Sequence, residues 1–562
     1  MDILEDIKRK ILDAAGADLE FTYPPTPDLG DLSLPVFALA KKEGKNPAEV
    51  AEKLAAKIRR HRAIKEMVSE IKIAGAYLNF YLDRRHLFSE TLRAIEKSQT
   101  AYGRKKNPRP EKIMIEYSNG NTHKEYHVGH LRNICYGDAI SRLLAAAGQK
   151  TISVSYINDF GIHTAKTLWG YLKFPKDKKF ENPGRALGEI YAEAVAKLGD
   201  NKEAAAEVGQ IMQAIESRQG DTYRLWEKTR NWSIKYFSEI YAELGIKFAQ
   251  TFYESDVIAD GLKIVEDLKK KNILEKSEGA IIANLEKYDL GVLPIIRSDG
   301  TALYPVADLA LAVKKFEKYH LDQSIYIVDV RQSLYFKQLF KILELMGYRQ
   351  KMTHLSYEFV TLPSGMMSSR TGNVITYQNL LADAKIRAQQ ETASRHVDWK
   401  NSRIEKLAAE LAVAAMKFEM LKVSANKIIT FNIDEALRYD GYTATYLEYT
   451  HARIRTLLKK AGAFPKSGAD FNNLTETREA ALIVKLAKFP EVIARAAAAY
   501  DPSEVAKYLF ELAQLFNDYY HEIPVIKAEK DIRNARLRLL TAVGQILANG
   551  LEILGIKALP QI

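Results

Sequence analysis

The chain has 562 residues, 47% of them hydrophobic, which is enough material to bury the cores of three or four domains. No apolar run is long enough to cross a bilayer, and the acidic start of the chain, Met1–Asp6, has no signal-type apolar core, so we expect a soluble protein rather than a membrane or secreted one. The formal charge of +11 favours a polyanionic partner, while the single cysteine excludes an internal disulfide framework and fits the reducing cytoplasm.

The first 98 residues combine helix and strand patterns. Residues 47–55 have helical spacing behind an N-terminal proline. Residues 71–73 and 77–82 are strand-like, and Gly75 between them suggests a turn. The pattern predicts a small α+β domain, which the basic, proline-bearing stretch 103–110 links to the next one.

The stretch from residue 113 to residue 132 is the most informative part of the chain. Its apolar start, 113–115, predicts a buried strand, and a polar loop then leads to a helix that opens on His127 and His130 around Gly129. A helix N-terminus presents free N–H groups and partial positive charge, which suit a polyphosphate. The glycine leaves room for a flat base, and histidines one turn apart can both donate to phosphate oxygens. The motif therefore indicates a nucleotide site.

Two other interpretations of these histidines are open on the motif alone. They could be a solvated or core pair, or half of a zinc site for which His123 and His163 are the nearest other ligands.

The helix after the histidines predicts one half of a nucleotide-binding sheet. Its apolar residues recur every four positions and include Cys135, which we interpret as core, and residues 152–156 alternate as a second strand. Such a strand–helix–strand unit is expected to be right-handed and parallel. Ligands bind at the carboxyl ends of such strands, where His127 falls. Asp159 follows the second strand at the same edge, as either a structural or a binding residue.

The middle of the chain holds a candidate side-chain pocket. Residues 170–249 are mainly helical with charged faces, and the sheet resumes at 280–285. Tyr304 and Asp308 stand four residues apart at the start of a helix, so both could face one pocket. An isolated pair of this kind would usually be a core ring and a helix cap.

A second loop and a helical C-terminal part complete the chain. The loop 362–374 contains the run Met366-Met367-Ser368-Ser369-Arg370, which on its own would be an unremarkable turn. Residues 407–420 form an Ala-rich periodic helix, and helical patterns continue from Gly441 onward.

Together these motifs resemble class I aminoacyl-tRNA synthetases, in the arginyl-tRNA synthetase version. Residues 127–130 resemble the HIGH signature and residues 362–374 the KMSKS loop, except that Met366 and Ser369 stand where the loop lysines would be. The resemblance covers nearly the whole chain and is most specific over residues 113–132, 297–333 and 362–376.

The resemblance implies an α/β fold with four parts. A Rossmann-type parallel-sheet catalytic domain spans 111–400 and includes a helical connective insertion at about 170–250. Residues 1–98 would form the small α+β N-terminal domain that meets the tRNA elbow, residues 401–440 a helical stem, and residues 441–562 an all-α, DALR-type anticodon-binding bundle.

The resemblance also assigns site residues. In the family, the guanidinium of arginine is held by residues that match Glu116, Tyr304 and Asp308, and the α-amino group by residues that match Asn121 and Gln332. This is physically sound because a guanidinium is planar, permanently charged and has five donors, and so needs carboxylates placed to accept paired bonds.

The implied ATP-binding residues are His127, Gly129, His130, Met367, Ser368 and Ser369. The implied catalytic residues are His127, His130, Lys124 in place of the missing loop lysines, and Arg370 as the remaining loop cation. The implied tRNA-binding residues are Tyr77, Asn79, Tyr446 and Arg453.

The implied activity is that of an arginine–tRNA ligase. It would use ATP with Mg²⁺ as substrate to form arginyl-adenylate and pass the arginine to tRNA(Arg), as a cytoplasmic monomer with no tightly bound cofactor and no protein-bound metal. Two alternatives are an RNA-binding paralogue without catalysis, suggested by the missing loop lysines, and a synthetase of the same class for another amino acid such as cysteine, which the lack of a zinc-ligand cysteine set disfavours.

Overall fold

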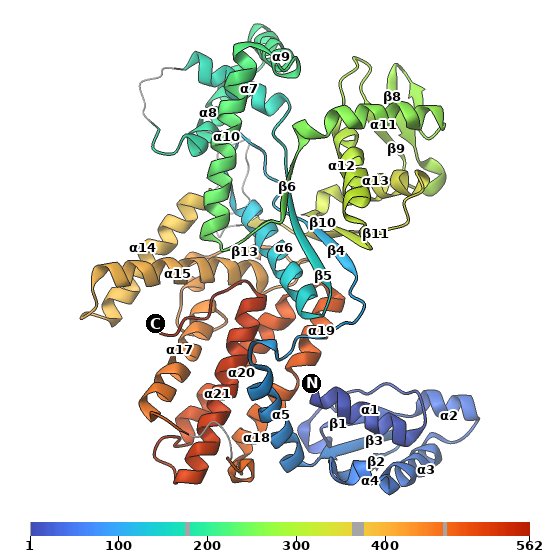
Figure 1. Cartoon of the computed structure of the whole chain (residues 1–562), viewed down its shortest axis with the longest axis vertical. Helices are drawn as coiled ribbons and strands as arrows, with labels where there is room; N and C mark the ends of the chain where they lie inside the picture. The colour runs from blue at the N-terminus through green and yellow to red at the C-terminus, as the bar shows by residue number, and fades with distance from the viewer. Residues whose placement is uncertain (1, 175–179, 362–375, 465–468) are drawn as a thin grey trace.

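The computed structural model of the protein describes residues 2–174, 180–361, 376–464 and 469–562. Within these ranges, no helix is both long and apolar enough to cross a membrane. A parallel sheet lies in the middle of the molecule, with the N-terminal domain and a helical bundle at one end and two inserted units at the other (Figure 1).

The N-terminal domain is a three-stranded antiparallel sheet with helices, as the sequence predicts. Its elements are α1 (Ile3–Ala15), β1 (Leu32–Pro35), α2 (Phe37–Glu43), α3 (Pro47–Arg60), α4 (Arg62–Lys65), β2 (Val68–Ala74), β3 (Tyr77–Leu82) and α5 (Arg84–Ser98). The predicted helix is α3, which begins at Pro47 behind the Asn46 cap. The predicted hairpin is β2–β3, and Gly75 in its turn has φ +62°, a backbone conformation that favours glycine.

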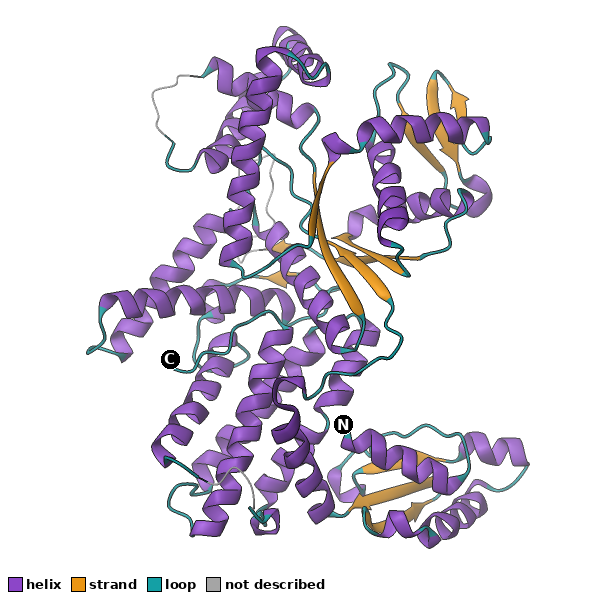
Figure 2. Ribbon diagram, in the orientation of Figure 1, coloured by secondary structure: helices purple, strands orange, loops and turns teal. Residues whose placement is uncertain are grey.

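The central sheet has five parallel strands in the order β11-β10-β4-β5-β6. Figure 2 shows the sheet in orange in the middle of the molecule. Its strands and the first crossover helix are β4 (Lys112–Glu116), α6 (Val128–Ala146), β5 (Lys150–Ile157), β6 (Gln250–Tyr253), β10 (Gln323–Asp329) and β11 (Lys351–Tyr357). The predicted strand–helix–strand unit is β4-α6-β5. The chain runs outward from β4 through β5 and β6, and then returns to add β10 and β11 on the other side of β4. The order of the strands therefore reverses between β4 and β10, which is where α/β sheets open a ligand crevice.

Two inserted segments follow strands of the sheet at its carboxyl edge, one after β5 and one after β6. The first is helical, as predicted, and consists of α7 (Ile162–Lys173), α8 (Pro183–Leu198), α9 (Lys202–Glu216) and α10 (Gly220–Glu243). The second contains α11 (Ile258–Lys270), β7 (Glu275–Ser277), β8 (Ala280–Asn284), β9 (Val292–Ile296) and α12 (Tyr304–Tyr319), and α13 (Ser333–Leu345) follows β10.

The strand predicted at 280–285 exists as β8, but it belongs to a separate antiparallel sheet, β7-β8-β9, rather than to the central one. The tight link to β7 explains this, because Glu278 and Gly279 both have positive φ and turn the chain straight back on itself.

From residue 360 onward, the described part of the chain is helical apart from one short strand pair. Its elements are β12 (Val360–Thr361), α14 (Tyr377–Arg395), α15 (Asn401–Leu421), β13 (Ile429–Thr430), α16 (Ile433–Ala436), α17 (Ala444–Ala461), α18 (Thr477–Ala487), α19 (Phe489–Ala499), α20 (Ser503–Glu522) and α21 (Lys530–Ile553). The helix predicted over 407–420 lies within α15. One continuous hydrophobic cluster joins the N-terminal domain, α6 and the bundle, and Cys135 is buried in it as expected.

Candidate functional site

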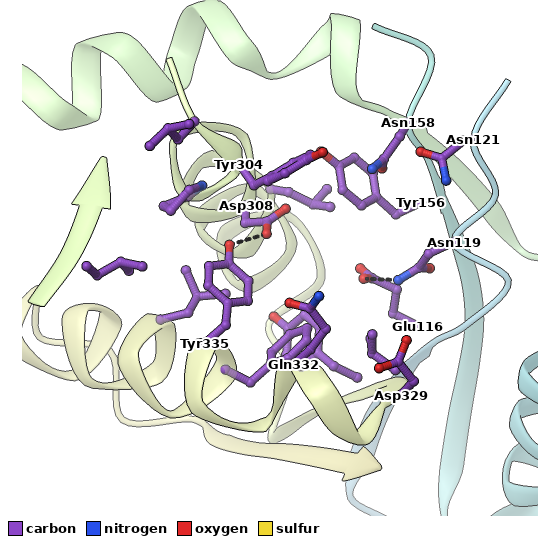
Figure 3. A pocket seen from close by; sticks show the side chains of 18 of the residues that line it. Glu116, Asn119, Asn121, Tyr156, Asn158, Tyr304, Asp308, Asp329, Gln332 and Tyr335 are labelled. Carbon is purple, nitrogen blue, oxygen red and sulfur yellow. Dashed lines mark hydrogen bonds between the residues drawn. The ribbon is translucent and has the colours of Figure 1, made fainter. Parts of the chain in front are cut away.

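A cavity of about 530 Å³ opens between the carboxyl ends of β4 and β10 and the start of α12 (Figure 3). All five residues expected to bind arginine line it, namely Glu116, Asn121, Tyr304, Asp308 and Gln332. The other polar residues of its wall are Asn119, Tyr156, Asn158, Tyr326, Asp329 and Tyr335. The tertiary structure thus brings together residues that are more than 200 positions apart in the sequence.

The α12 side of the pocket carries Tyr304 and Asp308. Tyr304 is the first residue of the helix and is 67% exposed at the mouth. Asp308 lies one turn further in, where its Oδ2 accepts a hydrogen bond from the Tyr335 hydroxyl. Burial, reinforced by the negative charge of Glu116, raises the pKa of Asp308 to about 7, although the Tyr335 bond opposes the rise. This carboxyl group would be stabilised by a cation.

Glu116 lies apart from Asp308, on the side of the pocket that carries Asn119 and Asp329 (Figure 3). It is 3% exposed, it forms an ion pair with the buried Lys315, and its Oε1 accepts a hydrogen bond from Asn119 Nδ2 at 3.3 Å. Its charge is therefore already matched within the protein, whereas Asp308 has only a hydroxyl partner among the described side chains.

Uncharged acceptors line the pocket around Glu116. The backbone N–H of Asn158 donates to the Gly120 carbonyl at 2.9 Å, which brings the ends of the β4 and β5 loops together beside Asn121. Asn119 and Asn158 each hold an Oδ1 that is buried without a hydrogen-bond partner in the described part of the chain. Buried acceptors are normally satisfied, so these two suit a ligand with N–H donors.

His127 and His130 cap the N-terminus of α6. The backbone N–H of Gly129 donates to Nδ1 of His127, and the backbone N–H of His127 donates to Nδ1 of His130, both at 3.1 Å. Burial, with the nearby Lys124 charge, lowers the pKa of His127 to about 4 and that of His130 well below its ordinary value. Both rings are therefore neutral at pH 7 and protonated on Nε2, which leaves that N–H free to donate to a ligand.

Gly129 lies close against the ring of its neighbour His127. A Cβ on Gly129 would lie 2.9 Å from Cε1 of His127, which is closer than carbon atoms pack. The sequence suggested space for a base as the reason for this glycine; the ring of His127 is a second, observed reason.

Lys124 lies beside this helix end. Its Nζ sits 4.9 Å from the centre of the Tyr191 ring on α8, and its charge contributes to the lowered pKa of His127, His130 and His163. Burial, together with Lys166, lowers the pKa of Lys124 itself. The residues expected in the second nucleotide loop, Met366, Met367, Ser368, Ser369 and Arg370, lie outside the described residues.

The zinc interpretation finds no support in the described ranges, where no three His, Cys, Asp or Glu side chains gather around a common point. Both ring nitrogens of His123 are within hydrogen-bond distance of a threonine hydroxyl, Thr122 at 2.9 Å and Thr229 at 2.8 Å. Asp159 is structural: it is fully buried, pairs with Arg230 and accepts from both the amide and the hydroxyl of Ser255.

The expected tRNA-binding residues differ in exposure. Tyr77 is 41% exposed and packs edge-on against the exposed Phe37, with 5.3 Å between ring centroids. Asn79 is only 7% exposed and its Oδ1 accepts from the Ser33 hydroxyl, so only the rest of its amide could reach a nucleotide.

In the bundle, Tyr446 and Arg453 share one partner. The Nδ2 of Asn517 donates to the Tyr446 hydroxyl at 2.9 Å, and Arg453 donates to Oδ1 of Asn517 at 3.0 Å. The Arg453 guanidinium also lies over the Tyr449 ring. Both residues are half-buried, so their free edges are small.

Glu254 is a buried carboxyl group near Asp308 that the sequence did not single out. It follows β6 at the same edge of the sheet, is 8% exposed, and its Oε2 has no hydrogen-bond partner among the described residues. Burial and the charges of Asp308 and Asp159 raise its pKa to about 8. Its sequence signal is weak because β6 has only four residues and no clear alternation.

Arg132 is a second residue whose role only the structure reveals. It lies in the first turns of α6, is 1% exposed, and donates to the carbonyls of Glu358, Phe359, Ser424, Ala425 and Lys427 at 2.7 to 3.5 Å. One guanidinium thus joins the histidine helix to the segments around β12 and β13.

The comparisons with known proteins agree with this geometry. Residues 91–434 match the catalytic domain of class I (R) tRNA synthetases, residues 1–82 the arginyl tRNA synthetase N terminal domain, and residues 447–562 the DALR anticodon binding domain. An arginine–tRNA ligase of Bdellovibrio bacteriovorus is 37% identical over 95% of this chain and 93% of its own length, and one of Clostridioides difficile is 31% identical over 98% and 97%. The structure of Thermus thermophilus arginyl-tRNA synthetase covers 100% of both chains with a TM-score of 0.84 at 27% identity. With its catalytic, N-terminal and anticodon-binding regions all matched, the chain belongs to the arginyl-tRNA synthetase family of class I aminoacyl-tRNA synthetases.

Proposed function

We propose that this chain activates L-arginine with ATP, accompanied by Mg²⁺ as part of the substrate, and transfers the arginine to the terminal adenosine of tRNA(Arg). The observation that carries the proposal is the carboxyl group of Asp308 in the pocket wall, together with the buried Glu254 near it: burial raises the pKa of both, and the charge of Asp308 raises that of Glu254 further. A permanent cation bound next to these carboxyl groups would offset the cost of ionising them.

A guanidinium fits this end of the pocket. Asp308 and Tyr304 line this end of the cavity, and Glu254, whose pKa the charge of Asp308 raises, holds an Oε2 without a hydrogen-bond partner among the described residues. A guanidinium has five donors and remains charged, so it could bond to both carboxylates at once. A neutral side chain would leave the two carboxyl groups without a counter-charge, which is a physical basis for selecting arginine.

The ammonium end would lie around Glu116. Glu116 would serve this end rather than the guanidinium, because it accepts a hydrogen bond from Asn119 and its charge is matched by Lys315 (Figure 3). Together with Asn121, Asn158 and Gln332 it offers acceptors for an α-ammonium group. Glu254 would instead join Asp308 and Tyr304 in binding the guanidinium.

The reaction needs ATP next to the arginine carboxylate, and the start of α6 supplies the donors. The Nε2–H groups of His127 and His130 would bond to phosphate oxygens, and the free amides of the helix end add partial positive charge. A carboxylate oxygen of arginine attacks the α-phosphorus and pyrophosphate leaves, so the protein's part is alignment and charge stabilisation. Lys124 is the proposed cation for the charge that develops on the phosphates, in place of the lysines that the second loop lacks.

We assign tRNA binding to the parts outside the catalytic region 111–400. Residues 1–98, through Tyr77, would meet the tRNA elbow, residues 401–440 would serve as a stem, and residues 441–562 would read the anticodon. We further propose that the chain acts as a monomer, and that it acts in the cytoplasm, where its substrates ATP and tRNA are used.

The decisive experiment incubates the purified chain with ATP, total tRNA and each amino acid in turn, and measures aminoacyl-tRNA and AMP. We expect arginyl-tRNA alone. Binding of tRNA without any product would favour the RNA-binding paralogue, and charging with a different amino acid would reassign the pocket.

A further inference from the structure

Lys315 is a fully buried lysine behind the wall of the arginine pocket. Its side chain is 0% exposed and pairs with Glu116, whose side chain is 4% exposed, and its Nζ lies 4.9 Å from the centre of the Tyr326 ring and 5.7 Å from that of Phe252. Aromatic rings and the Glu116 carboxylate therefore lie against it, its charge also lowers the pKa of Asp308, and water does not screen the pair.

The two partners lie on elements that lead to opposite ends of the pocket. Lys315 lies on α12, on the same face as Tyr304, Asp308 and Leu311, because these positions follow the three- and four-residue spacing of one helix face. Glu116 ends β4, five residues before Asn121. The ion pair thus ties the helix that carries the guanidinium end to the strand that leads into the ammonium end.

A buried ion pair adds little to the free energy of unfolding, but it can fix the separation of the two elements that carry it. Its attraction roughly repays the cost of removing both charges from water, so an uncharged pair of similar size is often tolerated. The short, directional contact nevertheless holds its two elements at one separation.

We propose that Lys315 is a specificity-determining positioning residue, which sets the length of side chain that the pocket accepts by fixing α12 against β4 through Glu116. The proposal rests on the proposed function of the pocket. It adds that the pocket prefers an amino acid with three methylenes between its α-carbon and its guanidinium group.

The test compares arginine with two analogues of different length, homoarginine with one methylene more and 2-amino-4-guanidinobutanoate with one fewer. Aminoacylation of tRNA(Arg) by the full chain gives kcat/KM for each. The native chain should prefer arginine by roughly 10–200-fold over either analogue, the usual worth of one methylene in a well-formed pocket. In Lys315→Met this preference should fall about tenfold for at least one analogue.

Three further variants make the result decisive. Lys314→Met removes a charge from the exposed neighbour on the same helix and should keep the native ratios. Lys315→Arg retains the ion pair and should largely restore them. The double variant Lys315→Met with Glu116→Gln leaves no unpaired buried charge, so it should fold even if the single variant does not, and should also lose the length preference.

A folded variant without the ion pair that keeps the native ratios would overturn the proposal. So would failure of both the single and the double variant to fold, because the pair would then be a requirement of folding. If the native chain charges no arginine at all, the proposed function itself fails, and the two failures are thereby distinguished.

Discussion

The imidazole rings of His127 and His130 lie 3.8 Å apart between centroids, and each uses Nδ1 to accept a backbone N–H at the start of α6. The same two residues therefore serve as helix cap and as ligand donor, through different nitrogens. The Nδ1 atoms stabilise the helix end, and the Nε2–H groups remain for phosphate.

Substitutions that mimic one nitrogen at a time separate these roles. In His127→Asn, the amide oxygen can replace Nδ1 as the cap, but nothing replaces Nε2. We expect unchanged thermal stability and a fall in the adenylation rate of roughly 10²–10³-fold, the usual cost of one preorganised donor. In His127→Gln, the amide nitrogen can replace Nε2, so we expect partial activity with a loss of about 1 kcal/mol of stability from the missing cap. Equal stability and equal rates in the two variants would show that the two nitrogens are not divided in this way.

The guanidinium site is tested by Asp308→Asn. Because one partner of a buried charge pair is lost while the arginine cation remains, arginine binding should weaken by about 2–5 kcal/mol. The measurement is KM for arginine, with citrulline as a neutral competitor, and the variant should discriminate less between the two. Asp260→Asn, on the exposed side of the neighbouring α11, is the control and should match the native chain. A near-native KM with preserved discrimination would remove Asp308 from the pocket.

Arginine binding should release protons near neutral pH. The pKa of Asp308 is raised to about 7 and that of Glu254 to about 8, mainly by burial, and a bound guanidinium would favour the ionised form of both. The KM for arginine should therefore fall as pH rises from about 6 through about 8 and level off at about pH 9. Calorimetry at about pH 7 in two buffers of different ionisation enthalpy would count the protons directly.

The same two groups have the opposite effect on the folding stability of the arginine-free protein, which falls as pH rises. Because these pKa values are raised above those of the unfolded chain, their contribution to stability is fully present at low pH and is lost as pH rises through about 7 and 8. The increase in Tm caused by arginine should accordingly be larger at about pH 8 than at about pH 6. Glu254→Gln should flatten the profile, and an unchanged profile would contradict the assignment.

Lys124 is the proposed counter-charge for adenylation. Removing it in Lys124→Ala should lower the rate of arginyl-adenylate formation by roughly 10²–10³-fold and leave arginine binding nearly unchanged, since the ammonium would act on the developing phosphate charge. Lys166→Ala is the matched control, because Lys166 is the neighbouring cation that lowers the pKa of Lys124. Wild-type single-turnover activation in Lys124→Ala would leave Arg370 as the remaining candidate.

The sequence by itself determined the local elements and the family motifs. The strand–helix–strand unit around His127, the β2–β3 hairpin and the helix that begins at Tyr304 follow from periodicity, capping residues and glycines, which act over a few neighbouring residues. The same short-range patterns singled out Tyr304 and Asp308, because both lie within two turns of one helix end.

Only the tertiary structure decided how charge is distributed in the pocket. Glu116 and Lys315 are 199 positions apart, so no local pattern could show that one neutralises the other and leaves Asp308 and Glu254 as the unmatched carboxyl groups. Likewise, β8 has a clear strand pattern, but its tight turn to β7 decided which sheet it joins. The physical reason is the same in both cases: burial and charge pairing depend on which distant segments meet, and those segments meet only when the whole chain has folded.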